Sequence, residues 1–343
     1  MTASDGGTIG GRPLVSICLK CWNQREFVAE ALEGVFSQTY RPLEIVICDD
    51  RSTDGSWEYL ESAVRGERAA ALRAEGVSIV LHRNPVNLGN AGNWEMCCEL
   101  AHGELLVKAD GDDVSLPDRT ARIVAAWDAD GRRAVAVCHS GWQIGPRGEP
   151  YGRLHQVTAN WQMGAAMAYS PRLFREFPRL PASALRCCDD VIWGRRALML
   201  GTILEIPDRL VRYRIGSGVT TTFWRIRAQC EFCERDFVTT LPVARADLAS
   251  LRGPSGEARE TEARRLEGDE RYHAAKLALV TASRFSERLA AYRRVQAVHR
   301  ALSVSAYLNL AFLLPRFLGT PMLFAYCCLR NLRWRLQRRE GQG

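Results

Sequence analysis

The chain has 343 residues, of which 47% are hydrophobic and 25% are charged. These values are ordinary for a chain that folds around a core, so they exclude intrinsic disorder, collagen and a coiled coil. The formal net charge of +7 is unevenly placed, because residues 1–222 hold 25 Lys and Arg against 27 Asp and Glu (−2), whereas residues 223–343 hold 21 against 12 (+9). A basic tail on a near-neutral body predicts an acidic surface as partner.

Residues 1–12 are small and polar and contain no apolar run. We therefore expect a flexible leader rather than a secretory signal peptide, and a chain that stays in the cytoplasm. In that compartment its twelve cysteines would be reduced.

Strand-like and helix-like segments alternate after this leader. Apolar runs over residues 13–19 and 43–48 are typical of buried strands, and apolar residues at helical spacing over 27–36 predict a helix between them. The pattern continues with a helix over 56–74, a strand over 77–81, a loop over 84–93, a helix ending at 101 and a strand over 105–108. This alternation predicts an α/β fold with a mostly parallel sheet covered by helices on both faces.

The following segments are less regular. Residues 115–118 predict the start of a helix, with Ser115 as N-cap and Pro117 in the first turn, and a strand is expected near 134–138. Residues 223–300 are rich in Arg and Glu at helical spacing, which predicts a charged helical extension.

Acidic clusters follow two of the predicted strands. Asp49 and Asp50 come after one strand, and Asp110, Asp112 and Asp113 come after another, where parallel sheets bind ligands. Aspartates favour turns and helix starts, but three carboxylates within four residues repel one another unless a cation lies among them. Asp110 and Asp112 could both reach one hard divalent ion that also takes phosphate oxygens. The sequence therefore predicts Mg²⁺ or Mn²⁺ together with a diphosphate.

Short motifs stand in a fixed order between residues 13 and 222. They occupy residues 15–23, 36–40, 43–56, 87–89, 103–104, 109–113, 116–118, 189–190, 196 and 210–214. In this order they resemble the inverting family 2 glycosyltransferases, whose GT-A fold is a Rossmann-type α/β fold that binds nucleotide sugars. The resemblance implies a GT-A-like catalytic domain over residues 13–222.

The resemblance also implies roles for individual residues. Asp50 takes the position that hydrogen-bonds the nucleobase, and Trp22 takes that of an aromatic residue that packs on the base. Asp112 takes the metal-binding position of the DXD motif, with Asp110 as its other arm. Asp190 takes the position of the catalytic base, which removes the proton of the acceptor hydroxyl as its oxygen attacks the anomeric carbon. From the residues alone, Trp22 could equally be a half-buried core aromatic.

The implied function is transfer of a sugar from a nucleoside diphosphate sugar, for which we expect a UDP-sugar, to an acceptor hydroxyl with inversion. The expected setting is the synthesis of cell-surface polysaccharide or glycan. One alternative is a sugar nucleotidyltransferase, which should carry a Gly-rich phosphate loop that residues 19–23 lack. Another is a non-catalytic nucleotide-sugar-binding module of the same fold, which an intact Asp112 and Asp190 argue against.

Departures from the family pattern occur near the expected donor site. Lys20 and Cys21 stand where family members commonly have a Pro and a small hydroxyl residue before the aromatic residue. Residues 93–95 stand where family members often have an Arg and an Asn. Arg212 and Arg214 precede a Gly-Ser-Gly sequence, and they could form either a flexible basic loop that closes over phosphates or a solvated strand.

Residues 301–343 form an apolar and basic tail. Pro315 and Pro321 interrupt its apolar part, so neither half reaches the roughly 20 apolar residues that a spanning helix needs. Two short apolar helices followed by arginines and Trp334 fit an anchor at the membrane interface, and the alternative is a helical hairpin packed in a protein core. We expect the anchor, which would make the protein peripheral on the cytoplasmic face with a lipid-linked glycan as acceptor. We do not expect nucleic acid as a partner.

Overall fold

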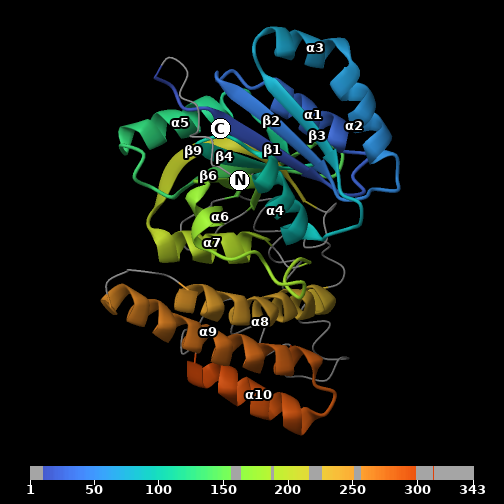
Figure 1. Cartoon of the computed structure of the whole chain (residues 1–343). Coiled ribbons are helices and arrows are strands. Elements are labelled where there is room, and N and C mark those ends of the chain that lie inside the picture. Colours follow the sequence, from blue (N-terminus) through green and yellow to red (C-terminus); the bar gives the residue numbers. More distant parts are fainter. Residues whose placement is uncertain are drawn as a thin grey trace, which may run out of the picture. The chain divides into compact units, whose positions relative to one another are not determined.

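The computed structural model describes residues 11–155, 164–186, 189–215, 226–250, 256–298 and 312. By its internal contacts the chain divides into two compact units (Figure 1). The first comprises Met1–Ile215 with Ala249–Arg252, and the second comprises Gly216–Leu248 with Gly253–Gly343. The first unit contains a β-sheet with its helices, and the described part of the second contains helices.

The first half of the sheet is parallel. Its strands are β1 (Val15–Cys21), β2 (Leu43–Asp49), β3 (Ser78–Arg83) and β4 (Leu105–Asp110), in the order β3-β2-β1-β4. Every residue of β1 and β2 is buried, as expected for strands covered on both faces. Because these strands run in one direction, their carboxyl ends meet at one edge of the sheet (Figure 1).

The second half of the sheet is mixed. Beyond β4 the order continues with β8 (Met167–Tyr169), β6 (Ala136–Ile144), β9 (Ile203–Arg214) and β5 (Val114–Ser115), and β7 (Pro150–His155) pairs with β6. The pairs β4–β8, β8–β6, β9–β5 and β6–β7 are antiparallel, whereas β6–β9 is parallel. The described strands thus form one nine-stranded sheet, and the predicted α/β class is confirmed.

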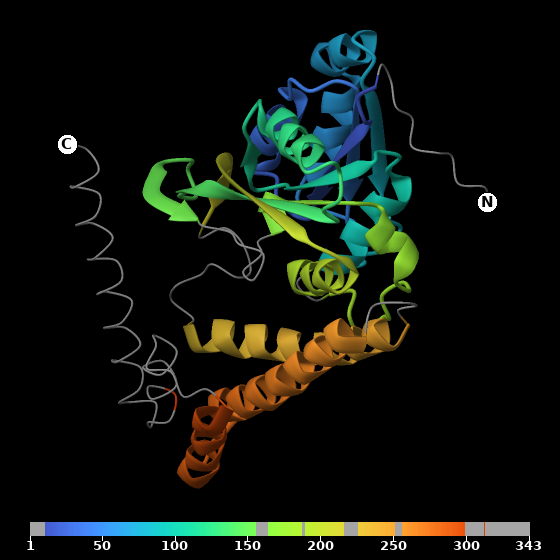
Figure 2. The same ribbon diagram turned by 90° about the vertical axis from the view of Figure 1, so that its left-hand side faces the viewer.

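Helices cover both faces of this sheet (Figures 1 and 2). On one face, odd-numbered residues of β1 such as Ile17 and Leu19 pack in one hydrophobic core with side chains of α1, α2, α3 and α5. On the other face, Trp94 of α4 contacts Tyr169 of β8, and Phe174 of α6 stacks near Trp193 of α7 with ring centroids 4.3 Å apart. The helices of the first unit are α1 (Val28–Phe36), α2 (Ser56–Arg65), α3 (Glu67–Ala74), α4 (Asn90–Leu100), α5 (Arg119–Ala129), α6 (Arg172–Glu176) and α7 (Asp189–Leu200), with a 3₁₀ turn at Gly164–Ala166.

Some predicted helix boundaries are wrong, for identifiable reasons. The helix expected over 56–74 is two helices, because the backbone of Gly66 is extended between them. The helix expected from Ser115 begins at Arg119, because Ser115 pairs with Val211 as part of β5. Helix α4 begins at Asn90, inside the expected loop, because the amides of residues 91 and 92 donate to the distant carbonyl of Leu185.

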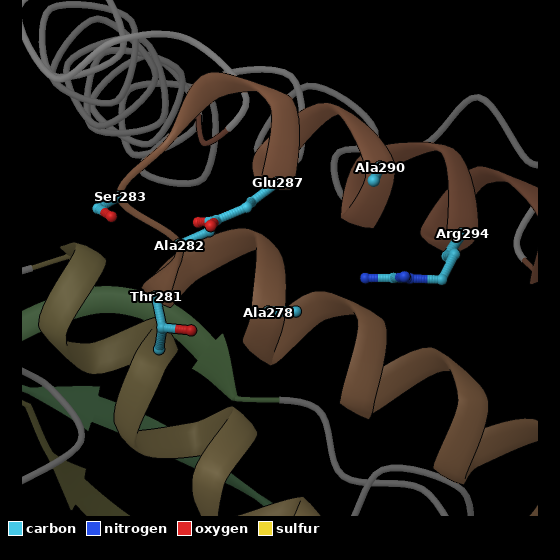
Figure 3. A pocket seen from close by; sticks show the side chains of 7 residues that line it. All are labelled: Ala278, Thr281, Ala282, Ser283, Glu287, Ala290 and Arg294. Atoms are coloured by element: carbon cyan, nitrogen blue, oxygen red, sulfur yellow. The ribbon is translucent and has the colours of Figure 1, made fainter.

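Helices α8 (Ile226–Ser250), α9 (Gly256–Thr281) and α10 (Phe285–Val298) lie within residues 223–300, and apart from the last residues of α8 they belong to the second unit. A pocket lies between α9 and α10, with Glu287 and Arg294 as its charged side chains (Figure 3). None of the predicted site residues lines it. Within the described ranges, no helix combines the length and apolar character needed to cross a membrane. The predicted tail over 301–343 lies outside the described residues except for residue 312.

Gln38 joins α1 to the start of α5. Its buried amide donates from Nε2 to the carbonyls of Gly34 and Leu116, both at 2.8 Å. Its Oε1 accepts from the amide and the hydroxyl of Thr120 at 3.0 and 2.7 Å. One side chain therefore satisfies polar groups of two elements that lie far apart in the sequence.

Replacing Gln38 with Leu should lower the free energy of unfolding by at least about 2 kcal/mol, because the Thr120 and Leu116 groups stay buried without partners. Chemical denaturation measures the change. The exposed neighbouring variant Thr39→Ala should cost about 0.5 kcal/mol or less. Equal effects of the two variants would contradict the joining role of Gln38.

Candidate active site

Asp50 lies directly after β2 and holds a loop against the end of that strand. Its Oδ1 accepts from the Leu88 amide at 2.7 Å and from Asn84 Nδ2 at 2.8 Å, and its Oδ2 accepts from the Gly89 amide at 2.8 Å. The carboxylate is 2% exposed. Three donors thus bind this carboxylate, and through it they fix the loop that precedes α4.

Trp22 lies at the neighbouring strand end. It follows β1, its ring is 49% exposed, and the amide of Asp50 donates to the carbonyl of Cys21 at 2.8 Å. The adjacent Asn23 has a left-handed backbone and is tied to the turn after β2, since its amide donates to Ser52 Oγ and its Oδ1 accepts from the Thr53 amide. The structure therefore brings Trp22 and Asp50 to adjacent strand ends, and the Trp22 ring is exposed rather than buried in a core.

The acidic turn over residues 110–113 follows β4 and is closely held by the backbone. The Gly111 amide donates to the carbonyl of Lys20 at 3.0 Å, and the Asp113 amide donates to the carbonyl of Asp110 at 3.1 Å. Burial, together with the negative charge of Asp110, raises the pKa of Asp112 to about 6. Burial and the charge of Asp112 raise the pKa of Asp113 well above its usual range. Burial and mutual repulsion therefore both disfavour the charged forms of Asp112 and Asp113.

Arg214 belongs to the end of β9 and is buried. Its amide donates to Asp113 Oδ1 at 2.7 Å, and its Nε donates to the carbonyl of Asp112 at 2.9 Å. Its Nη2 pairs with Glu30 at 2.8 Å. Arg214 therefore holds the acidic turn in place, which neither the basic-loop nor the solvated-strand interpretation anticipated.

Asp189 and Asp190 open α7. Asp189 is 2% exposed, and its Oδ1 accepts from the amide of Asp190 at 2.9 Å. Although burial alone would raise it, the pKa of Asp189 falls to about 2 because the cations of Lys108 and Lys20 face its carboxylate. Asp190 is half-buried, and burial reinforced by the charge of Asp189 raises the pKa of Asp190 to about 6. The two adjacent carboxylates thus have pKa values far apart, about 2 for Asp189 and about 6 for Asp190.

Lys20 and Lys108 connect the two acidic clusters, and the sequence did not predict this. Lys20 Nζ lies 3.1 Å from both an Asp110 and an Asp189 oxygen, and Lys108 Nζ lies 3.5 Å from Asp110 and 2.8 Å from Asp189. A usable signal was present, because the chain has only three lysines and the alternation of β1 and β4 puts Lys20, Lys108 and Asp110 on one face of the sheet. Their partner Asp189 comes from a distant helix start, which no local pattern indicates.

Gly164 leaves room for this arrangement. A Cβ at Gly164 would collide with the Lys108 ammonium, and Asp189 lies close by. The neighbouring carbonyls of Lys108 and Ala165 both accept from the buried Arg119 guanidinium, at 2.8 and 2.7 Å. The Lys108 side chain itself is 2% exposed, so its ammonium group is shielded from solvent.

The fold is that of GT-A-like glycosyltransferases, as comparisons with solved structures show. Among solved structures, TarS of Staphylococcus aureus in complex with UDP-GlcNAc superimposes with a TM-score of 0.55 over 95% of this chain and 92% of that one, at 15% identity. The mannosyltransferase PcManGT of Pyrobaculum calidifontis, in complex with GDP-Man and Mn²⁺, superimposes with a TM-score of 0.53 over 91% and 87% of the two chains, at 18% identity. At these identities the likeness shows the fold.

Sequence comparison identifies the family. Residues 16–199 match the family described as Glycosyl transferase family 2, which is more than half of the chain, and the chain belongs to that family. A relative in Escherichia coli, the UDP-Glc:alpha-D-GlcNAc-diphosphoundecaprenol beta-1,3-glucosyltransferase WfaP, is 31% identical over 100 residues, which are 29% of this chain and 36% of that protein. EpsE of Bacillus subtilis is likewise matched over only 38% of its length. The family assignment confirms the predicted resemblance and disfavours the nucleotidyltransferase alternative.

Replacing Asp50 with Ala should release the loop before α4, because the amides of Leu88 and Gly89 lose their acceptor. We expect hydrogen exchange at these two amides to accelerate at least about tenfold, as local opening no longer breaks hydrogen bonds to Asp50. Nuclear magnetic resonance or mass spectrometry measures the exchange. The surface variant Asp128→Asn is the control and should leave it unchanged; unchanged exchange in Asp50→Ala would contradict the assigned role.

Proposed function

We propose that this protein transfers a sugar from a nucleoside diphosphate sugar, a UDP-sugar in our expectation, to an acceptor hydroxyl with inversion. The observation that carries the proposal is that the acidic turn over 110–113 and the Asp189-Asp190 helix start, far apart in the sequence, face the same pair of lysines. An inverting transfer needs both a group that holds the donor diphosphate and a base for the acceptor near one anomeric carbon.

Trp22 and Asp50 are the proposed base-binding residues. The exposed Trp22 ring offers a face for stacking, and the three protein donors occupy three of about four acceptor positions of the Asp50 carboxylate, which leaves one on Oδ2. An imide N–H of a uracil ring is a suitable donor for that position. The UDP-GlcNAc bound by TarS and the UDP-Glc in the name of WfaP support a uridine donor.

Asp110 and Asp112 are the proposed holders of a Mg²⁺ or Mn²⁺ ion. The acidic turn fits such an ion, because burial and the charge of Asp110 raise the pKa of Asp112 and a cation would offset both effects. In the described ranges no group of at least three His, Cys, Asp or Glu side chains is arranged to hold a metal, so the diphosphate and water would supply the remaining ligands. A bound divalent ion supplies positive charge for the departing diphosphate. The Mn²⁺ in the PcManGT complex supports this proposal.

Asp190 is the proposed catalytic base. With a pKa of about 6 it is mostly ionised at neutral pH, yet basic enough to accept the proton of an attacking hydroxyl. Asp189 cannot share this role well, since its carboxylate pairs with Lys20 and Lys108 and its pKa is about 2. In the proposed step the acceptor oxygen bonds to the anomeric carbon, the bond to the diphosphate breaks, and the acceptor proton moves to an Asp190 oxygen.

The acceptor is proposed to be a glycan or a lipid-linked glycan in cell-surface polysaccharide synthesis. The support is the diphosphoundecaprenol-linked sugar in the name of WfaP, a relative that is 31% identical to this chain over 100 residues. Peripheral binding at the cytoplasmic face of a membrane stays a prediction that depends on the basic tail.

Donor binding should require a divalent ion. We expect calorimetric titration of UDP to give a dissociation constant at least about tenfold lower with Mn²⁺ than without it, because the ion joins the acidic turn to the diphosphate. Asp112→Asn should abolish the Mn²⁺ effect, and Asp128→Asn should keep it. If the folded protein binds no UDP under either condition, the uridine assignment is wrong. The same titration with GDP then tests whether the donor is a guanosine diphosphate sugar.

The rate of transfer should fall about tenfold for each pH unit below about 6, because protonated Asp190 cannot accept the acceptor proton. Asp190→Asn should lower kcat by about 10²–10⁴ and leave UDP affinity within about threefold, because the base does not hold the donor. Steady-state kinetics across pH measures both effects. A variant that retains wild-type kcat would exclude Asp190 as the base.

A further inference from the structure

Three buried charged residues and the partly buried Asp110 form a closed set of ion pairs, which we call the ion-pair quartet: Lys20, Lys108, Asp110 and Asp189. Each ammonium lies within 3.5 Å of both carboxylates. The exposed fractions of the side chains are 9% for Lys20, 2% for Lys108, 20% for Asp110 and 3% for Asp189. Two positive and two negative charges balance, which permits their burial.

The quartet joins two elements that carry different parts of the proposed chemistry. Asp110 begins the acidic turn after β4, on the donor side, and Asp189 begins α7. The Asp189 carboxylate accepts from the Asp190 amide at 2.9 Å and from Asn90 Nδ2 at 3.3 Å, and Lys20 also pairs with the Asn90 side chain. Contacts therefore run without interruption from the acidic turn, through the lysines and Asp189, to the backbone of Asp190.

Stability alone is a weak reason for such a set. A buried ion pair loses hydration on folding, and apolar residues of similar volume commonly stabilise a protein as well or better. Paired charges restrict the geometry more than apolar packing does, because both ammonium groups must stay between both carboxylates. A Cβ at Gly164 would collide with the Lys108 ammonium, so a larger residue there would require Lys108 to move.

We propose that Lys20 and Lys108 are positioning residues that hold the start of α7, and with it Asp190, at a set place relative to the acidic turn. This inference rests on the proposed function for Asp190. The lysines touch neither the reacting atoms nor the acceptor in this account. They act through Asp189, and a small displacement of a catalytic group is enough to lower a rate about 10²-fold.

Lys108→Met tests the proposal with Lys276→Met as the matched control. Lys276 is the third lysine, and it pairs with Glu234 at 2.8 Å within the second unit. We expect Lys108→Met to accelerate hydrogen exchange of the Asp190 amide at least about tenfold, because the Asp189 carboxylate loses its partner at 2.8 Å. We expect kcat for sugar release from UDP-glucose or UDP-N-acetylglucosamine to fall about 10- to 100-fold with KM nearly constant. Lys276→Met should change none of these.

The double variant Lys108→Met/Asp189→Asn separates positioning from folding. In Lys108→Met the negative charge of Asp189 has lost one of its two lysine partners, and Asp189→Asn removes that charge. We therefore expect the Tm to return toward the wild-type value, while kcat stays at least about tenfold below that of the wild type. If kcat recovers together with the Tm, or if exchange of the Asp190 amide is unchanged in Lys108→Met, the positioning role is overturned. If the wild-type protein is inactive, the proposed function is contradicted. Hydrogen exchange is measured without turnover, so it would still show whether the lysines position the start of α7.

Discussion

The site depends on how buried negative charge is compensated at the carboxyl edge of a parallel sheet. Five aspartates gather there, in the turn over residues 110–113 and at the start of α7. Such carboxylates would repel one another and lose hydration, so their burial requires cations at fixed places. Lys20 and Lys108 supply them for Asp110 and Asp189, and Arg214 binds the turn through its amide and guanidinium. Asp112 and Asp190, the residues with proposed metal-binding and base roles, both have pKa values raised to about 6 by burial and by a neighbouring negative charge.

The strand order explains why these groups meet. β1 and β4 are parallel neighbours in register, with Lys20 opposite Asp110, so alternation puts Lys20, Lys108 and Asp110 on one face of the sheet. That face carries α4 and α7, and the contacts of Trp94 with Tyr169 and Phe174 pack α4 against β8 and α6. The opposite face carries the large hydrophobic core. One face of the sheet therefore stabilises the unit, and the other places the polar site.

Local patterns in the sequence predict the helices, the strands and the positions of the acidic residues. They do not predict which cationic side chains pair with those acidic residues. Apolar runs located β1 and β2, and the aspartates stood after strands, where parallel sheets bind ligands. The start of α4 is not visible in the local sequence, because its first amides donate to the distant carbonyl of Leu185. The role of Arg214 is not visible either, because its partners lie on distant segments. The lysine pair was missed for the same reason, since Asp189 reaches it only through the tertiary fold. What a residue does locally is visible in the sequence, whereas which charge it neutralises is decided by topology.

The most direct test of the central claim is anomalous diffraction at the manganese edge from crystals grown with UDP and Mn²⁺. The account predicts one anomalous peak beside Asp112 and the UDP diphosphate, with Lys20 and Lys108 still between Asp110 and Asp189. Bound UDP with no peak at the acidic turn, or with the peak at another part of the chain, would contradict the assignment of this edge as the donor site.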